Sequence, residues 1–306
     1  MNVLLLSTKN KYMKHSQRTY IPGSQWIYFK IYTGKVEADK LLLEYITPTI
    51  NILTKNKNIE KWFFIRYSDP DFHIRLRILA SNMHSVNYII YCFYKRLMHC
   101  QVNGIIWKVQ LDTYNRELER YGQELIEEAE SIFYLDSKCV LSILKILGQD
   151  QQFRWMISFK LVEALLTDFC LDLTTKQQIM GSLDNEFKKE FGFHDHNMKQ
   201  LNTKYRNNRK IIETILENTI NDTLFRKLYI PIKNRSKSMS FIVNKLHLKI
   251  ENSHKTVDYH SLLKSYIHMM LNRLFNDKNR MHELVIYNFM NRYYKSLIAK
   301  KIYNKS

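Results

Sequence analysis

The stretch Phe72–Leu79 constrains the fold of this chain most, because apolar and charged residues alternate along its length. Side chains of a β-strand point alternately to opposite faces of a sheet, so this period of two predicts a half-buried strand. One face of the strand then carries only His73, Arg75 and Arg77. Guanidinium groups offer planar pairs of donors, so this rigid row predicts a receptor for carboxylates or phosphates, unless it is an ordinary solvated sheet face. We expect Arg66, on the preceding strand, to add to the row.

The elements around this strand follow a recognisable order. Three further stretches have strand character, and two have the spacing of helices. The strands are Trp26–Thr33, Trp62–Tyr67 and Ile105–Asp112, and the helices are Glu37–Leu53, with a break before Pro48, and Ser85–Cys100. The resulting β-α-β-β-α-β order is the split pattern of ferredoxin-like folds.

After Tyr114 the strand signals vanish and helical patterns take over, although Arg226–Leu248 is ambiguous. We therefore predict an α+β fold, in which an N-terminal ferredoxin-like β-α-β-β-α-β sheet is followed by a mostly helical C-terminal half. The expected organisation is a single domain over 1–306. Its parts are an N-terminal extension at 1–24, the ferredoxin-like part at 25–115 and the helical part at 116–306.

Several classes of protein are disfavoured by composition. No apolar run is long enough to span a bilayer, and the seven glycines form no phosphate-binding loop. The four cysteines form no CxxC pair, so we expect reduced thiols in a cytoplasmic protein. His194-Asp195-His196 does not suggest a metal site, because neighbouring side chains diverge on a helix and no third ligand is evident. We expect no metal and no cofactor.

Charge is unevenly distributed along the chain. The formal net charge is +18, and most of it lies between Asn197 and Ser306. This basic half is either a solvated, lysine-rich surface or a field that attracts acidic partners. Those partners include an anionic peptide, a nucleic acid and a carboxylate-bearing substrate, and charge alone does not choose among them.

Two more clusters could carry chemistry. In Tyr114–Gly122, a helix would place Arg116 and Arg120 one turn apart on one face, although a surface helix with local ion pairs has the same spacing. In Tyr266–Phe275, an apolar stripe leaves His268 and Asn272 together on an adjoining face. A histidine with a pKa near its usual value of about 6.5 suits proton transfer at neutral pH, but a structural histidine would occupy the same position.

These blocks together resemble a known family. Trp62–Ile78, Tyr114–Gly122 and Tyr266–Phe275 are similar to motifs of the C-terminal elimination domain of class I lanthipeptide dehydratases, also called the thiopeptide-type bacteriocin biosynthesis domain. The opening WIYFKIYTG is similar as well. The resemblance extends from about Gln25 to the C-terminus, and the middle of the chain, 124–255, contributes little to it.

The resemblance implies an activity. A separate tRNA-dependent protein esterifies Ser or Thr of a precursor peptide with glutamate, and this domain removes the Cα proton and expels glutamate, leaving dehydroalanine or dehydrobutyrine. The family's functional residues fall by motif on Arg75, Arg77, Arg116 and His268. The expected substrate-binding residues around them are Arg66, His73, Arg120, Asn272 and Arg273. The implied partners are the glutamylated precursor, the glutamylating protein in trans and a possible cyclase.

Three other functions remain open at this point. The same family includes pyridine synthases, which join two dehydroalanines in a formal [4+2] cycloaddition and eject the leader peptide. A non-catalytic module could instead hold a leader peptide by adding it as a strand to a sheet edge. Direct nucleic-acid binding is disfavoured, because the basic half, with Tyr205, Tyr229 and Tyr294, carries no recognised binding motif.

Overall fold

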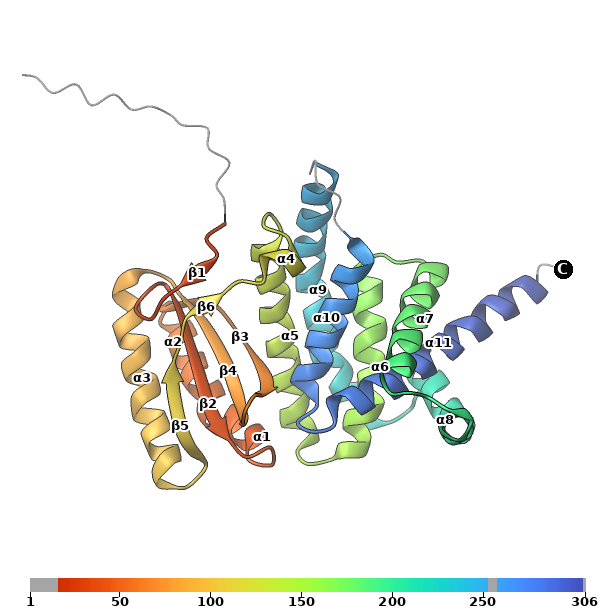
Figure 1. Cartoon of the computed structure of the whole chain (residues 1–306), viewed down its shortest axis with the longest axis horizontal. Helices are drawn as coiled ribbons and strands as arrows, with labels where there is room; N and C mark the ends of the chain where they lie inside the picture. The colour runs from red at the N-terminus through yellow and green to blue at the C-terminus, as the bar shows by residue number, and fades with distance from the viewer. Residues whose placement is uncertain (1–15, 253–257, 305–306) are drawn as a thin grey trace, which may run out of the picture.

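The computed structural model describes residues 16–252 and 258–304 of the chain. Its N-terminal part is a four-stranded antiparallel sheet in the order β3-β4-β2-β5. The strands are β2 (Trp26–Thr33), β3 (Ile59–Ser68), β4 (Phe72–Ala80) and β5 (Ile106–Leu111). The connecting helices are α1 (Ala38–Lys40), the π-helical turn η1 (Leu41–Ile46), α2 (Thr47–Lys55) and α3 (Met83–Val102). Figure 1 shows this sheet beside the helical half, and the ferredoxin-like prediction is confirmed.

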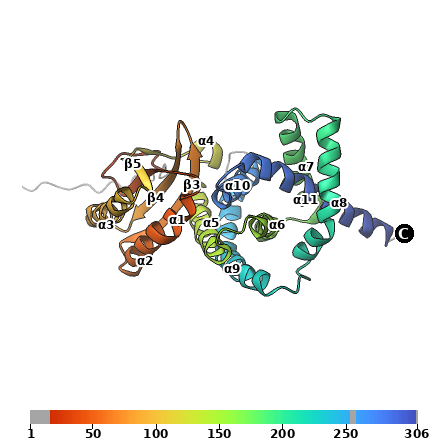
Figure 2. The same cartoon turned by 90° about the horizontal axis from the view of Figure 1, so that it is seen from below.

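Helices α2 and α3 cover one face of the sheet (Figure 2). The predicted helix over Glu37–Leu53 is present, but η1 interrupts it immediately before Pro48. Proline has no backbone N–H, so it cannot continue the regular hydrogen-bond ladder, and a widened turn at this point is a common accommodation. The core of this layer includes Phe29 and Phe93, whose rings lie 5.1 Å apart.

A two-stranded ribbon lies on the other face of the sheet. It pairs β1 (Thr19–Tyr20) with β6 (Tyr114–Asn115). The ring of Tyr114 lies edge-on to Trp26 and Tyr28 of β2, at 5.3 and 6.5 Å. The end of the predicted extension at 1–24 is therefore packed against the sheet, while residues 1–15 lie outside the described part. The predicted division into an extension and two parts stays a prediction.

The C-terminal half is helical, as predicted, and begins with the short helix α4 (Leu118–Tyr121). The long helices are α5 (Ile126–Leu147), α6 (Gln151–Asp168), α7 (Leu173–Glu190), α8 (Asp195–Leu216), α9 (Thr223–Glu251), α10 (Tyr259–Leu274) and α11 (Asn279–Tyr303). The ambiguous segment Arg226–Leu248 lies within α9, which continues through Pro231. In the described residues, no helix is long and apolar enough to cross a membrane.

The two edges of the sheet differ. Along β3, the amide group of Asn272 from α10 accepts a hydrogen bond from the Arg66 N–H and donates one to the Arg66 carbonyl oxygen, both at 2.9 Å. The Ser137 hydroxyl of α5 accepts a further one from the Phe64 N–H at 3.3 Å. Side chains thus replace a neighbouring strand along β3 and join the helical half to the sheet. The residues of β5 are mostly exposed, and its outer edge has no paired strand among the described residues.

A buried ion-pair network also joins the two halves. Asp39 of α1 pairs with Arg66 of β3 at 2.5 Å and with Arg154 of α6 at 2.6 Å. All three residues are at most 3% exposed. Burial alone would raise the pKa of the Asp39 carboxyl, but the two guanidinium groups outweigh it and hold that pKa below its usual 3.8.

Candidate functional site

The strand register places the predicted cationic row on one face of the sheet. His73, Arg75 and Arg77 of β4 lie opposite Tyr32, Lys30 and Tyr28 of β2, so these six side chains share that face. The row is not a solvated surface, however, because His73 is 0% exposed and Arg77 only 9%. The β1–β6 ribbon and the neighbouring aromatic rings cover the end of the row at Arg77.

Arg77 sits in a cage of aromatic rings. Its guanidinium carbon lies 4.6 Å from the ring centre of Tyr28, 4.9 Å from that of Tyr114 and 5.4 Å from that of Phe63. Its Nε is buried and has no hydrogen-bond partner among the described residues. Aromatic faces stabilise the cation without neutralising it. Arg77 therefore keeps an unpaired positive charge at the inner end of the row.

Arg75 is held in place by an aromatic ring and a histidine. Its guanidinium stacks on the ring of Tyr67, 3.4 Å from the centre, and its Nε donates to Nε2 of His73 at 3.1 Å. Nδ1 of His73 lies 2.8 Å from the Asp71 carbonyl oxygen, which can only accept, so the ring proton sits on Nδ1. Burial, together with the charge of Arg75, lowers the pKa of His73. A neutral His73 thus fixes the direction of Arg75 and is not itself free to bind a carboxylate.

Arg116 directly follows β6, and its guanidinium is paired with a buried carboxylate. It donates from Nε and Nη2 to the two oxygens of Glu130 in α5, each at 2.7 Å, and it is 5% exposed. The Tyr114 hydroxyl also donates to Glu130, at 2.8 Å. Arg77, Tyr114, Glu130 and Arg116 therefore form one contiguous chain of contacts.

The expectation that Arg116 and Arg120 share a helical face is wrong. Arg116 lies before α4, in the turn that follows β6, whereas Arg120 lies within α4. Arg120 is exposed and pairs with Glu117 at 3.2 Å. The short turn aims the two guanidinium groups in different directions, so Arg120 is separate from the buried chain of contacts.

The expectation that Arg66 extends the cationic row is also wrong. Arg66 lies opposite Ile74 of β4, so its side chain emerges on the opposite face from that of Arg75. There it binds Asp39 and donates from Nε to the Arg273 carbonyl oxygen at 3.0 Å. Its guanidinium joins the sheet to the helices, and Arg66 also lines the cavity of His268.

His268 of α10 lines a cavity of about 530 Å³ between the β3–β4 turn and the segment that joins α10 to α11. Asn272, one turn further along α10, lines the same cavity, as the predicted common face requires. Nδ1 of His268 lies 2.7 Å from Oε1 of Glu283 in α11, a carboxylate that is 0% exposed. Tyr67, whose ring holds the Arg75 guanidinium, lines the same cavity.

Further charged side chains surround this cavity. They are Lys35, Asp277, Lys278 and Arg280. Lys35 pairs with Asp277 at 2.7 Å, and Arg280 contacts Glu283 at 3.2 Å and Glu190. Sequence reasoning missed this set and Glu283, because they lie beside His268 only in the folded chain.

Arg273 does not reach the cavity. It is 0% exposed, lies 4.9 Å above the Phe133 ring and donates to the Met269 carbonyl oxygen at 2.8 Å. Burial lowers the pKa of its guanidinium to about 10. Arg273 is therefore buried in the helical core and does not lie where the predicted substrate contact requires.

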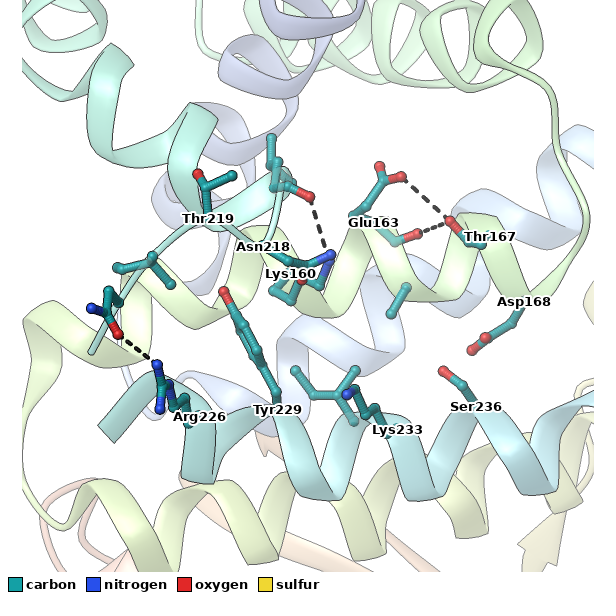
Figure 3. A pocket seen from close by; sticks show the side chains of 15 residues that line it. Lys160, Glu163, Thr167, Asp168, Asn218, Thr219, Arg226, Tyr229, Lys233 and Ser236 are labelled. Carbon is teal, nitrogen blue, oxygen red and sulfur yellow. Dashed lines mark hydrogen bonds between the residues drawn. The ribbon is translucent and has the colours of Figure 1, made fainter. Parts of the chain in front are cut away.

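A larger cavity than this one lies elsewhere in the described part of the molecule. It occupies about 910 Å³ between α6, the α8–α9 link and α9. Figure 3 shows Lys160, Tyr229 and Lys233 in its wall. None of the predicted site residues lines it, so we place the candidate site at the smaller cavity. No group of His, Cys, Asp and Glu among the described residues is arranged to hold a metal ion.

A ferredoxin-like sheet with a cationic face thus packs against a helical half that carries a histidine-lined cavity. The family model for the C-terminal part of lantibiotic biosynthesis dehydratases matches residues 26–294. The chain belongs to this family, which confirms the resemblance seen in its motifs.

Curated relatives agree with this assignment. The nisin biosynthesis protein NisB of Lactococcus lactis subsp. lactis is 26% identical over 282 residues, which cover 91% of this chain and 26% of NisB. The subtilin biosynthesis protein SpaB of Bacillus subtilis is 28% identical over 190 residues, which cover 58% of this chain and 17% of SpaB. The chain thus spans about a quarter or less of the length of these relatives.

Solved structures share the fold. The tRNA-dependent lantibiotic dehydratase MibB from Microbispora sp. 107891 aligns with a TM-score of 0.74 at 19% identity, over 91% of this chain and 29% of MibB. The pyridine synthase TbtD from thiomuracin biosynthesis aligns with a TM-score of 0.61 at 12% identity, over 89% of this chain and 98% of TbtD. At these identities the likeness concerns the fold alone.

Proposed function

We propose that this chain eliminates glutamate from glutamylated Ser or Thr residues of a ribosomally made precursor peptide, leaving dehydroalanine or dehydrobutyrine. The observation that carries the proposal is the pairing of His268 with Glu283 at the wall of a cavity that is also lined by Tyr67, the residue whose ring holds the Arg75 guanidinium. A base and a fixed cation are the two groups that β-elimination of a carboxylate requires.

In the proposed reaction, Nε2 of His268 takes the Cα proton of the esterified residue. The electrons of that C–H bond form the Cα–Cβ double bond, and the Cβ–O bond breaks. Glutamate departs with the electron pair as a carboxylate. Arg75 and the unpaired charge of Arg77 stabilise that carboxylate as its charge develops. Arg116, whose guanidinium is occupied by Glu130, acts through the chain of contacts that holds Arg77.

We infer two further features of this system. The glutamate is attached by a tRNA-dependent activity that acts before this domain, and a cyclase follows the dehydration. All four cysteines are free, which suits a reducing compartment, and we place the reaction in the cytoplasm.

Cycloaddition is the second candidate, because TbtD has the same fold over 98% of its length. The experiment offers the purified chain two leader-bearing peptides, one with a glutamyl ester and one with two dehydroalanines, and follows both by mass spectrometry. We expect loss of glutamate from the first peptide and no change in the second. Ejection of the leader from the second peptide, with the ester of the first intact, would instead identify a pyridine synthase.

A non-catalytic leader-binding module is the third candidate, and the open edge of β5 is the observation that favours it. Both peptides would then bind and return unchanged. Nucleic-acid binding has lost support, because Tyr294 is 1% exposed and its hydroxyl is bound to Glu163. A buried ring is not free to stack on bases.

A further inference from the structure

Glu283 is a buried carboxylate whose position is explained by its contact with His268. We propose that Glu283 is a positioning residue: it fixes the tautomer of His268 that presents Nε2 to the cavity, and it stabilises the imidazolium formed on proton transfer. This inference rests on the proposed elimination and names a residue that acts through His268.

The geometry determines which nitrogen carries the proton. Glu283 uses its two oxygens for two different donors, with Oε1 2.7 Å from Nδ1 of His268 and Oε2 3.2 Å from Nη1 of Arg280. An ionised carboxylate only accepts, so Nδ1 of His268 carries the hydrogen and Nε2 carries the lone pair. Nε2 has no hydrogen-bond partner among the described residues, and the His268 side chain is 35% exposed.

The charges around this pair keep Glu283 available to His268. Arg280 divides its guanidinium between Glu283 and Glu190, and it lies 4.0 Å above the Phe187 ring. It therefore donates to one oxygen of Glu283 and leaves the other oxygen to His268. The other titratable or charged groups facing the pair are Lys35, Arg66, Asp277, Lys278 and Tyr287. Lys35 and Asp277 neutralise each other, and Arg66 is paired with Asp39.

The test replaces Glu283 with glutamine, which has almost the same shape. A glutamine amide can donate to Nδ1 and so favour the wrong tautomer, and it removes the charge that stabilises the imidazolium. We expect kcat for elimination to fall about 100-fold or more. The acid limb of the pH–rate profile should also move to lower pH, because the protonated ring has lost its counter-charge.

Glu190→Gln is the matched control. It removes the other carboxylate on Arg280, and the half-exposed Glu190 side chain makes no hydrogen bond or ion pair with His268 among the described residues. We expect its kcat to stay within about twofold of the wild-type value, since it leaves the His268–Glu283 pair intact. If Glu283→Gln does not fold, Glu283→Asp keeps the charge and should retain the wild-type acid limb.

Nitrogen-15 NMR of histidine-labelled protein separates this inference from the proposed function. Wild-type His268 should carry its proton on Nδ1, and the Glu283→Gln variant should shift toward the other tautomer. If the wild-type protein does not eliminate glutamate, the proposed function fails while the NMR result still tests the pairing. Protonation on Nε2 in the wild type, or wild-type kcat and pH profile in Glu283→Gln, would overturn the role of Glu283.

Discussion

Replacing His268 with alanine is expected to slow glutamate elimination by about 10²–10⁴-fold, the range typical of a lost general base. Nδ1 of the ring lies 2.7 Å from Oε1 of Glu283, and the ring lines the cavity where the esterified residue would bind. The alanine variant leaves both the cavity and the cationic row in place. Single-turnover kinetics on a glutamylated peptide should therefore show normal binding and a slow chemical step.

His260→Ala is a suitable control for this variant. His260 lies on the same helix, α10, is exposed and does not line the cavity. Its replacement should leave the rate within about twofold of the wild type. Equal rates for His268→Ala and the wild type would show that His268 is not the base of the reaction.

Replacing Asp39 with asparagine is expected to lower the free energy of unfolding by about 3–5 kcal/mol at neutral pH. Arg66 and Arg154 are 2% and 0% exposed, so the substitution leaves two buried guanidinium groups without their carboxylate. An uncompensated buried charge is costly because the interior replaces its hydration poorly. Urea denaturation followed by circular dichroism measures the difference.

The effect of this substitution should depend on pH with a defined sign. The folded-state pKa of Asp39 lies below 3.8, so its stabilisation is fully present above about pH 4 and is lost as the pH falls through the folded value. The difference between the wild type and Asp39→Asn should therefore shrink below pH 4. Glu119→Gln breaks only an exposed pair with Arg18 and should leave the free energy of unfolding almost unchanged. A similar small, pH-independent loss for Asp39→Asn would show that the network does not stabilise the fold.

The sheet could be predicted because its strands have short, local signatures. The bounds Trp26–Thr33 of β2 were recovered from alternation alone, and the face shared by His73, Arg75 and Arg77 follows from the same period. Arg66 could not be assigned to a face in this way. Its strand is buried along Trp62–Arg66, so no alternation marks which side chains point toward the helices.

The candidate site was less predictable, because its partners come from distant segments. Glu130 and Glu283 follow Arg116 and His268 by 14 and 15 residues and lie on other elements, and only tertiary packing brings their carboxylates within 2.7 Å. The sequence has no signal that marks a glutamate as the partner of a particular arginine or histidine. Family motifs identified Arg75, Arg77, Arg116 and His268, whereas the structure supplied the groups that hold them.

The most direct test of the central claim is the mass of a leader-bearing peptide, glutamylated at one serine, after incubation with the purified chain. Elimination predicts a product one water lighter than the unmodified peptide, together with free glutamate. Simple hydrolysis of the ester would instead return the unmodified mass. That result, or an ester that persists at high enzyme concentration, would contradict the assignment of this chain as a glutamate-eliminating enzyme.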